Sequence, residues 1–127
     1  MPQESQEDKV LASFLSYIDA FNAEDIQGVR DHIDETIEIF VNGKQIGQGQ
    51  GRDKLLPMWQ ADMDLHKRVE ITKGPVCTVK GEIAEIDVEL TATVKRKGEA
   101  DVVQVVPVLY VIDATTMLHT RHQITLQ

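Results

Sequence analysis

The sequence predicts an α+β fold in which three N-terminal helices pack on a strongly curved, mostly antiparallel sheet. Three observations carry this prediction. Apolar residues recur every three or four positions in the first third of the chain, which is typical of amphipathic helices. An Asn42-Gly43 pair ends an alternating segment and marks a tight hairpin. From Arg68 onward, apolar and polar residues mostly alternate, which indicates long strands.

The first helix is expected from about Gln6 to Ala23. Ser5 and Asp8 have the spacing of an approximate capping box, and acidic residues in the first turn favour the helix dipole. Tyr17 lies beside the apolar stripe, so its ring can be buried while its hydroxyl needs a hydrogen-bond partner. The stripe consists of Val10, Leu11, Phe14, Ile18 and Phe21.

A short second helix follows the break at Asn22 and ends near Asp34. Asp25 is placed to cap it, and Ile26, Val29 and Ile33 recur at helical spacing. The period then changes to two: one face of the next strand carries Ile37, Ile39 and Val41.

A third helix is expected from Arg52 to about Leu65, after a flexible GQGQG turn at 47–51. Pro57 lacks a backbone donor and crowds the carbonyl of Asp53, so the helix either starts late or bends. We expect a bend that places Trp59 over the sheet. The apolar residues of this helix are Leu55, Leu56, Met58, Trp59 and Met63.

The remainder of the chain is predicted to be strand. A turn at Lys80-Gly81 separates residues 69–79 from a regularly alternating strand, residues 84–94. Residues 95–97 are basic and precede Gly98, which indicates the solvated tip of a hairpin. The segment 102–112 is apolar on both faces, and a last strand is expected from about Met117 to Leu126.

Composition limits the classes of function. A length of 127 residues fits one domain, residues 1–127. A net charge of −8 argues against partners that are nucleic acids or anionic membranes, because both require a basic surface. The single cysteine, Cys77, excludes an internal disulfide and fits a reducing compartment. With no signal peptide or membrane-spanning run in the sequence, we expect a cytoplasmic protein.

Two residues are candidates for catalysis. Tyr17 is either a hydrogen-bond donor to a ligand or a core aromatic satisfied by a backbone carbonyl. His122 has the parity of Ile124, so it is expected to point inward, where an imidazole can act as an acid or base or can simply be a buried, hydrogen-bonded histidine. His119 and Arg121 have the opposite parity and are expected to face a partner or solvent.

No metal or cofactor is predicted. Glu85, Asp87 and Glu89 alternate along about 13 Å of strand, too far apart to share one ion, so a charged surface is the preferred interpretation. His32 has no metal-ligand spacing to His66. Trp59 with Met58 and Met63 can roof an apolar ligand or plug the open end of the sheet.

The segment Tyr17–Asp25, YIDAFNAED, resembles the first-helix signature of the nuclear transport factor 2-like superfamily, particularly its SnoaL-like and ketosteroid isomerase-like branches. Gly51, followed by Leu55 and Met58, resembles the family's start of the third helix. The resemblance implies a cone-shaped, cystatin-like fold around a pocket that hosts many unrelated activities. The residues expected to line that pocket are Phe14, Phe21, Val41, Met58, Trp59, Met63, Leu90, Leu109 and Ile124.

The resemblance also implies which isomerase groups are missing. The family's isomerase tyrosine matches Tyr17, its general-base aspartate matches Val41, and its second acid falls near Leu109. Without a base there is nothing to move the proton, so steroid isomerisation is not expected. Two functions stay open: a pocket for a small, largely apolar molecule, as in an isomerase, cyclase or hydrolase, or a non-catalytic module whose cavity is filled by its own side chains.

The segment 102–112 predicts a homodimer. We expect Val103, Val105, Pro107, Leu109 and Val111 to line the interior. The opposite face would then be an exposed apolar patch, which pairing with a second copy would cover. The residues expected at this interface are Val106, Val108 and Tyr110, with Arg121 and His119 near its edge.

Overall fold

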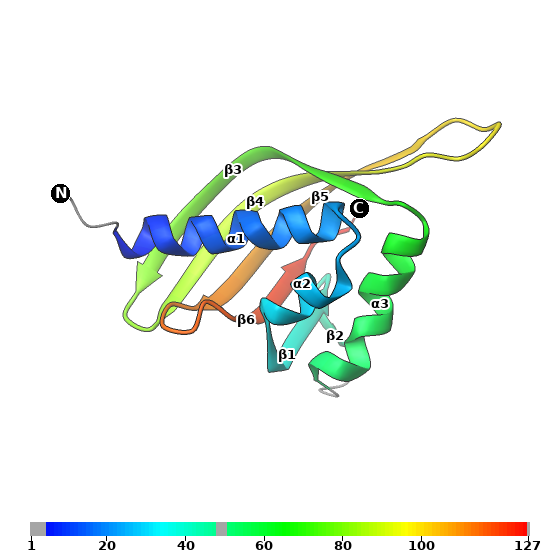
Figure 1. The fold of residues 1–127 in the computed structure, drawn as a ribbon. Coiled ribbons are helices and arrows are strands. Elements are labelled where there is room, and N and C mark those ends of the chain that lie inside the picture. Colours follow the sequence, from blue (N-terminus) through cyan, green and yellow to red (C-terminus); the bar gives the residue numbers. More distant parts are fainter. Residues whose placement is uncertain (1–4, 48–50, 127) are drawn as a thin grey trace.

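The computed structural model describes residues 5–47 and 51–126 of the chain. The three helices lie on one face of a six-stranded sheet (Figure 1). The helices are α1 (Gln6–Asn22), α2 (Ile26–Asp31) and α3 (Arg52–Asp64). The strands are β1 (Ile33–Val41), β2 (Lys44–Ile46), β3 (Arg68–Lys80), β4 (Ile83–Val94), β5 (Val102–Asp113) and β6 (His119–Ile124).

The sheet has the strand order β2-β1-β6-β5-β4-β3. Every neighbouring pair is antiparallel except β1 and β6, which run parallel. The strands after α3 therefore form the expected antiparallel meander, and its last strand returns beside the first strand of the chain. The predicted α+β architecture of helices on a curved, mostly antiparallel sheet is confirmed.

The two N-terminal caps form as predicted. The Ser5 hydroxyl accepts a hydrogen bond from the amide of Asp8 at 3.1 Å, and the Asp25 carboxylate accepts one from the amide of Gly28 at 3.0 Å. The predicted end of α2 was wrong, however. The helix stops at Asp31, and Ile33 is the first residue of β1, where it pairs with His119 of β6. Strand pairing overrides the helical spacing of Ile33.

The third helix begins at Arg52 and continues through Pro57, so a late start is excluded. Its buried residues, Leu55, Trp59 and Met63, face the interior. The expected turn before this helix falls largely on residues 48–50, which lie outside the described residues. At the earlier hairpin, Asn42 and Gly43 both have positive φ, 52° and 81°, as a tight two-residue turn requires.

Strand β5 presents the opposite face to the interior from the one predicted. Val108, Tyr110 and Ile112 are buried, whereas Val103 and Val105 are 59% and 48% exposed. The register with β4 explains this, because Val108 and Tyr110 pair with the buried residues Val88 and Ile86. Both faces of β5 are apolar, so its own alternation could not indicate which one points inward.

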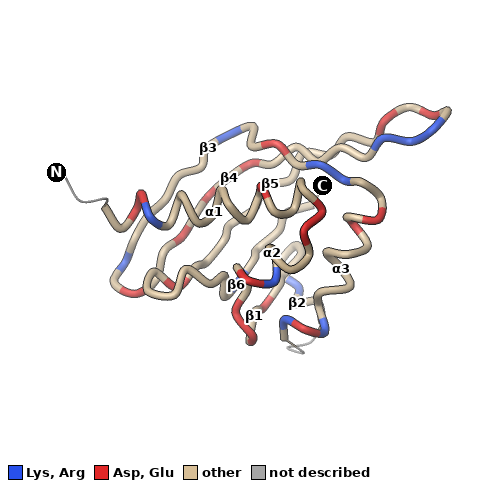
Figure 2. The backbone as a smooth tube through the Cα atoms, viewed as in Figure 1, with Lys and Arg blue, Asp and Glu red and all other residues tan. Residues whose placement is uncertain are grey.

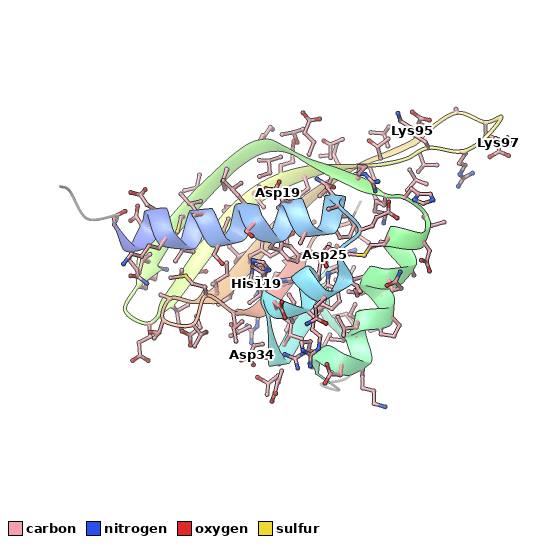
Figure 3. All side chains as sticks on the ribbon, viewed as in Figure 1. Asp19, Asp25, Asp34, Lys95, Lys97 and His119 are labelled. Carbon is pink, nitrogen blue, oxygen red and sulfur yellow. The ribbon has the colours of Figure 1, made fainter. Side chains whose placement is uncertain are left out.

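Strand β6 places both His119 and His122 in the interior, which corrects the prediction that His119 faces a partner or solvent. Its pairing with β5 shifts between Val111–Arg121 and Ile112–His119, so Thr120 is an extra residue in the strand. Such a bulge changes the side on which following residues lie. Two histidines three positions apart therefore share one face, and Figure 3 shows His119 between the helices and the sheet.

Charged residues occur along the helices, on the long strands and on the β4–β5 hairpin (Figure 2). The basic tip at 95–97 is exposed at the end of the β4–β5 hairpin, as predicted, and Figure 3 shows Lys95 and Lys97 there. On the outer sheet face, Glu85 and Glu89 form ion pairs with Lys80 and Lys73. Within the described ranges, no three His, Cys, Asp or Glu residues are grouped to hold a metal, and no helix is both long and apolar enough to cross a membrane.

Candidate functional site

A cavity of about 170 Å³ lies between α1, α3 and the inner face of the sheet. We call it the inner cavity. Its walls are mostly apolar, with a few polar groups, which is the usual composition of a small-molecule site. Lining residues come from α1 (Tyr17, Ile18, Phe21), α3 (Met58, Trp59, Asp62), the connection from α3 to β3 (Lys67) and the sheet (Val69, Leu90, Ala92, Val106, Val108, Tyr110, His122, Ile124).

The structure brings most of the residues singled out from the sequence to this cavity. Those that line it are Tyr17, Phe21, Met58, Trp59, Leu90, His122 and Ile124. Phe14 and Met63 are buried but do not line the cavity, and Val41 lies at the end of β1, paired with Ile124. Leu109 is on the outer sheet face, so its predicted place in the pocket was wrong for the same reason as the rest of β5.

Eight lining residues were missed from the sequence, and three of them are polar: Tyr110, Asp62 and Lys67. Tyr110 had been predicted at a dimer interface, yet it is 4% exposed and its ring centre lies 4.8 Å from that of Phe14. Pairing the regular alternation of β4 against β5 would have found it. Nothing in the sequence indicated Asp62 and Lys67, which form an ion pair of 2.9 Å between α3 and the start of β3.

Tyr17 is oriented by Trp59. The indole Nε1 of Trp59 donates a hydrogen bond to the Tyr17 hydroxyl at 3.1 Å, and both side chains are buried. The hydroxyl oxygen therefore acts as an acceptor, and the Tyr17 hydroxyl donates no hydrogen bond to a described residue. Burial raises the pKa of Tyr17 to about 12. At neutral pH the hydroxyl is protonated and can donate to a ligand.

The two interior histidines are hydrogen-bonded to each other. Nδ1 of His119 lies 2.9 Å from Nε2 of His122. Burial lowers the pKa of His122 to about 3 and also lowers the pKa of His119, to which the neighbouring His122 and His32 contribute. Both rings are therefore neutral at physiological pH, and one proton lies between them.

The location of that proton decides what His122 offers to the cavity. Nε2 of His119 is the one fully buried side-chain nitrogen or oxygen in the described chain that has no partner. A buried N–H without an acceptor is rarer than an acceptor without a donor. This favours the tautomer in which Nδ1 of His119 carries the proton and donates it to Nε2 of His122, while Nε2 of His119 is unprotonated. His122 then carries its proton on Nδ1, which makes no hydrogen bond within the described chain.

Tyr110 adds another hydroxyl to the cavity. Its ring packs within 4.6 Å of His122, centre to centre, and its hydroxyl makes no hydrogen bond to a described residue. Burial raises the pKa of Tyr110 well above its usual value. The cavity thus presents hydrogen-bond donors on Tyr17, His122 and Tyr110, and all three are neutral at physiological pH.

This arrangement suits hydrogen bonding better than proton transfer. A general acid or base works best when its pKa lies near the operating pH, whereas the pKa values of Tyr17 and His122 lie about 12 and 3. The carboxylate that reaches the cavity, Asp62, is engaged by Lys67. A ligand group that accepts hydrogen bonds, such as a carbonyl or ether oxygen, is the natural complement.

Comparisons with solved structures identify the architecture. The chain is similar to the epoxide hydrolase/cyclase-like enzyme SalBIII of pyran ring formation in the polyether salinomycin, with a TM-score of 0.75, 14% identity and coverage of 97% of this chain and 95% of that one. The chain is also similar to a ketosteroid isomerase-like protein from Erwinia carotovora atroseptica, with a TM-score of 0.72, 15% identity and coverage of 98% of both chains.

An NTF2-like protein with a cystatin-like fold from Novosphingobium aromaticivorans gives a TM-score of 0.71 and 15% identity, covering 91% of this chain and 77% of that one. No protein-family model and no curated protein matches the sequence. The likeness to known proteins is therefore one of structure, at low sequence identity.

Proposed function

Because the chain has the cystatin-like fold of the nuclear transport factor 2-like proteins, we propose that its inner cavity binds a small, largely apolar molecule that accepts a hydrogen bond from Tyr17. The observation that carries this proposal is the Trp59–Tyr17 hydrogen bond. It holds the hydroxyl as an acceptor toward the indole and leaves its proton to be donated within an apolar cavity. A buried donor without an acceptor is costly, so a ligand oxygen at this position is favoured.

The size of the cavity limits the ligand. An apolar cavity of about 150 Å³ accommodates a benzene molecule, so the inner cavity, at about 170 Å³, fits one ring or a short branched chain. The low pKa of His122 and the high pKa of Tyr17 favour a binding role over acid–base catalysis at this site. The alternative of a cavity filled by its own side chains is disfavoured by the open volume.

A matched ligand pair tests this function. Acetophenone carries a carbonyl where α-methylstyrene carries a methylene group of similar shape. Titrations followed by ligand-observed NMR are expected to give tighter binding of acetophenone. Tyr17→Phe should weaken acetophenone about fivefold, equivalent to one hydrogen bond of about 1 kcal/mol, and leave α-methylstyrene unchanged. Equal losses for both ligands would refute the role of the hydroxyl, and no binding of either would refute the pocket.

We also propose that the chain forms a homodimer through the outer face of its sheet. The face of β5 that points away from the helices carries Val103, Val105, Pro107, Leu109 and Val111. Val76 on the same side of β3 is 62% exposed. An apolar surface of this kind is favourable to cover, and a two-fold axis lets one patch pair with its own copy.

A further inference from the structure

A second hollow, of about 450 Å³, adjoins the inner cavity. We call it the outer hollow. It shares Lys67 and Ala92 with the inner cavity. Along β5, Tyr110, Val108 and Val106 line the inner cavity, and the next two residues of the same face, Gln104 and Val102, line the outer hollow. Residues two apart on a strand are separated by about 7 Å, so the two spaces follow one another along a continuous sheet face.

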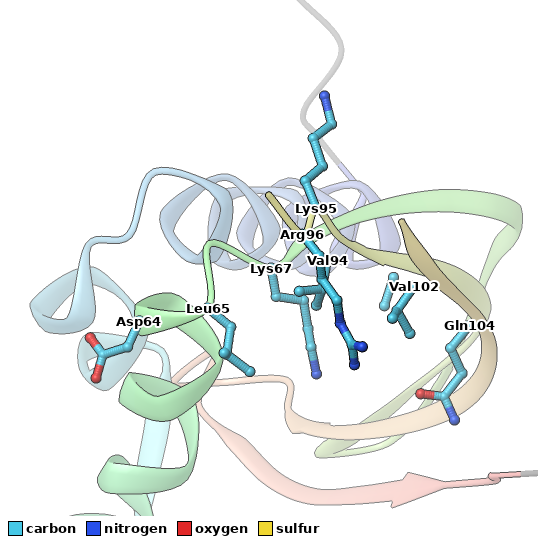
Figure 4. Close-up of a pocket in the computed structure, with 9 residues that line it drawn as sticks. Asp64, Leu65, Lys67, Val94, Lys95, Arg96, Val102 and Gln104 are labelled. Atoms are coloured by element: carbon cyan, nitrogen blue, oxygen red, sulfur yellow. The ribbon is translucent and has the colours of Figure 1, made fainter. Parts of the chain in front are cut away.

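The floor of the outer hollow is apolar and its rim is basic. Leu65, Val94 and Val102 supply the apolar surface. Figure 4 shows the ends of Lys67 and Arg96 pointing in the same direction into the space between Leu65 and Gln104, while Lys95 points away. This basic rim occurs in a chain whose net charge is −8, and Figure 2 marks the basic segments that supply it, on the β4–β5 hairpin and where the chain enters β3.

Both cations keep donors for a ligand. Lys67 gives one N–H to Asp62 at 2.9 Å, and Arg96 gives one to Glu99 at 3.3 Å. An ammonium group has three N–H donors and a guanidinium has five, so most of them remain free. The acidic lining residue, Asp64, accepts a hydrogen bond from Gln60 of its own helix and points away from the two cations in Figure 4.

From this geometry we infer that the ligand is an apolar monoanion, such as a carboxylate, whose anionic group lies in the outer hollow between Lys67 and Arg96. This inference rests on the proposed binding function of the inner cavity. The apolar body occupies the inner cavity, and a linker passes Ala92 and Lys67, the residues that the two spaces share. Charge-assisted hydrogen bonds to the anion then add orientation to a cavity that is otherwise apolar.

The test compares 3-phenylpropanoate with 3-phenylpropanol, which share a ring and a linker and differ in charge. Trp59 is the single tryptophan and lines the inner cavity, so its fluorescence reports the arrival of a ring, with ligand-observed NMR as a second measurement. The carboxylate is expected to bind roughly threefold to tenfold more tightly at low salt. This preference should shrink as salt rises, while binding of the alcohol stays constant.

Two variants of the hairpin supply the control. Arg96→Gln should remove most of the preference for the carboxylate, whereas Lys97→Gln, which removes one charge from the same hairpin but does not line the outer hollow, should retain it. Lys67→Gln should act like Arg96→Gln. The anionic ligand is refuted if the alcohol binds as tightly as the carboxylate, or if Arg96→Gln and Lys97→Gln change the preference for the carboxylate equally. In either case the proposed binding function of the inner cavity still stands. If neither compound binds although acetophenone does, the extension of the ligand into the outer hollow is refuted and the proposed function stands. If acetophenone also fails to bind, the proposed function itself is refuted.

Discussion

Nδ1 of His119 and Nε2 of His122 lie 2.9 Å apart in the interior, and the two rings share one proton. Neither side chain is more than 3% exposed. The pair exists because Thr120 is an extra residue in β6, which turns two histidines three positions apart onto one face. Its neutrality has a consequence for stability, because an unfolded chain exposes both rings to water.

The first prediction is a loss of stability in mild acid. In the folded protein the pKa of both histidines lies below the unfolded value of 6.5, at about 3 for His122. Below pH 6.5 the unfolded state therefore binds more protons, and stability falls as the pH falls toward the folded value. His122 is expected to cost about 2 kcal/mol between pH 6.5 and 5, and His119 is expected to add a loss in the same direction. Urea unfolding from pH 7.5 to 5 measures this, in a range where most carboxylates stay ionised.

The control removes both rings. A His119→Phe, His122→Leu double variant replaces the pair by apolar groups and should flatten the pH dependence of the free energy of unfolding over the same range. The His119→Phe single variant leaves Nε2 of His122 without its partner and is expected to be less stable than the double variant at pH 7.5. A double variant that retains the wild-type slope would assign the acid sensitivity to other groups.

The second prediction concerns Gly51, which opens α3. Its φ of 86° with ψ near 180° is a conformation that glycine alone adopts readily. A β-carbon here would lie 2.6 Å from the backbone oxygen of Glu35. Gly51→Ala is therefore expected to cost about 3 kcal/mol or more of unfolding free energy, while Gly81→Ala, with φ of 62° and nothing within 4 Å, should cost about 1 kcal/mol. Similar losses in both variants would contradict this assignment.

Local patterns in the sequence predicted the elements well, and failures arose where a neighbouring strand decided the outcome. The caps at Ser5 and Asp25, the Asn42-Gly43 turn and the alternation of β4 each depend on a few adjacent residues. The inward face of β5 depends on its register with β4, because both of its faces are apolar. The position of His119 depends on a bulge that leaves no mark in the sequence.

In the candidate site too, residues in locally patterned elements were predicted, and residues whose position depends on a neighbouring element were missed. Tyr17 and Trp59 were found from helical periodicity, and they meet in one hydrogen bond across 42 positions of the chain. Tyr110 was assigned to the wrong face together with Leu109. The Asp62–Lys67 pair could not be anticipated, because it depends on how the chain leaves α3 and enters β3.

The third prediction is that the protein does not catalyse steroid isomerisation. The position matched to the general base is Val41, which lies at the end of β1 and does not line the inner cavity. His122 is a poor replacement, because a base with a pKa of about 3 holds a proton too weakly to remove one from carbon at neutral pH. A steroid isomerase assay should match the buffer rate for the wild type and for Tyr17→Phe. A Tyr17-dependent rate above that of buffer would contradict the binding role.

The fourth prediction separates the two faces of β5. Val105 is 48% exposed on the outer face, so Val105→Asp should leave the fold intact and dissociate the proposed homodimer. Val108 is 5% exposed beside the inner cavity, so Val108→Asp buries an unpaired carboxylate and should destabilise the fold by several kcal/mol. Sedimentation at micromolar concentration is expected to give about twice the 14.3 kDa chain mass for the wild type and the single-chain mass for Val105→Asp.

Ser16→Asp, on the exposed face of α1, adds the same charge away from the sheet and serves as the control. It should sediment as the wild type does, because its charge lies on the helical layer, whereas the proposed interface is the uncovered side of β5. Urea unfolding of each variant distinguishes dissociation from loss of the fold. A wild-type protein that sediments at the mass of one chain would refute the dimer, and a stable Val108→Asp variant would contradict the inward orientation of that face.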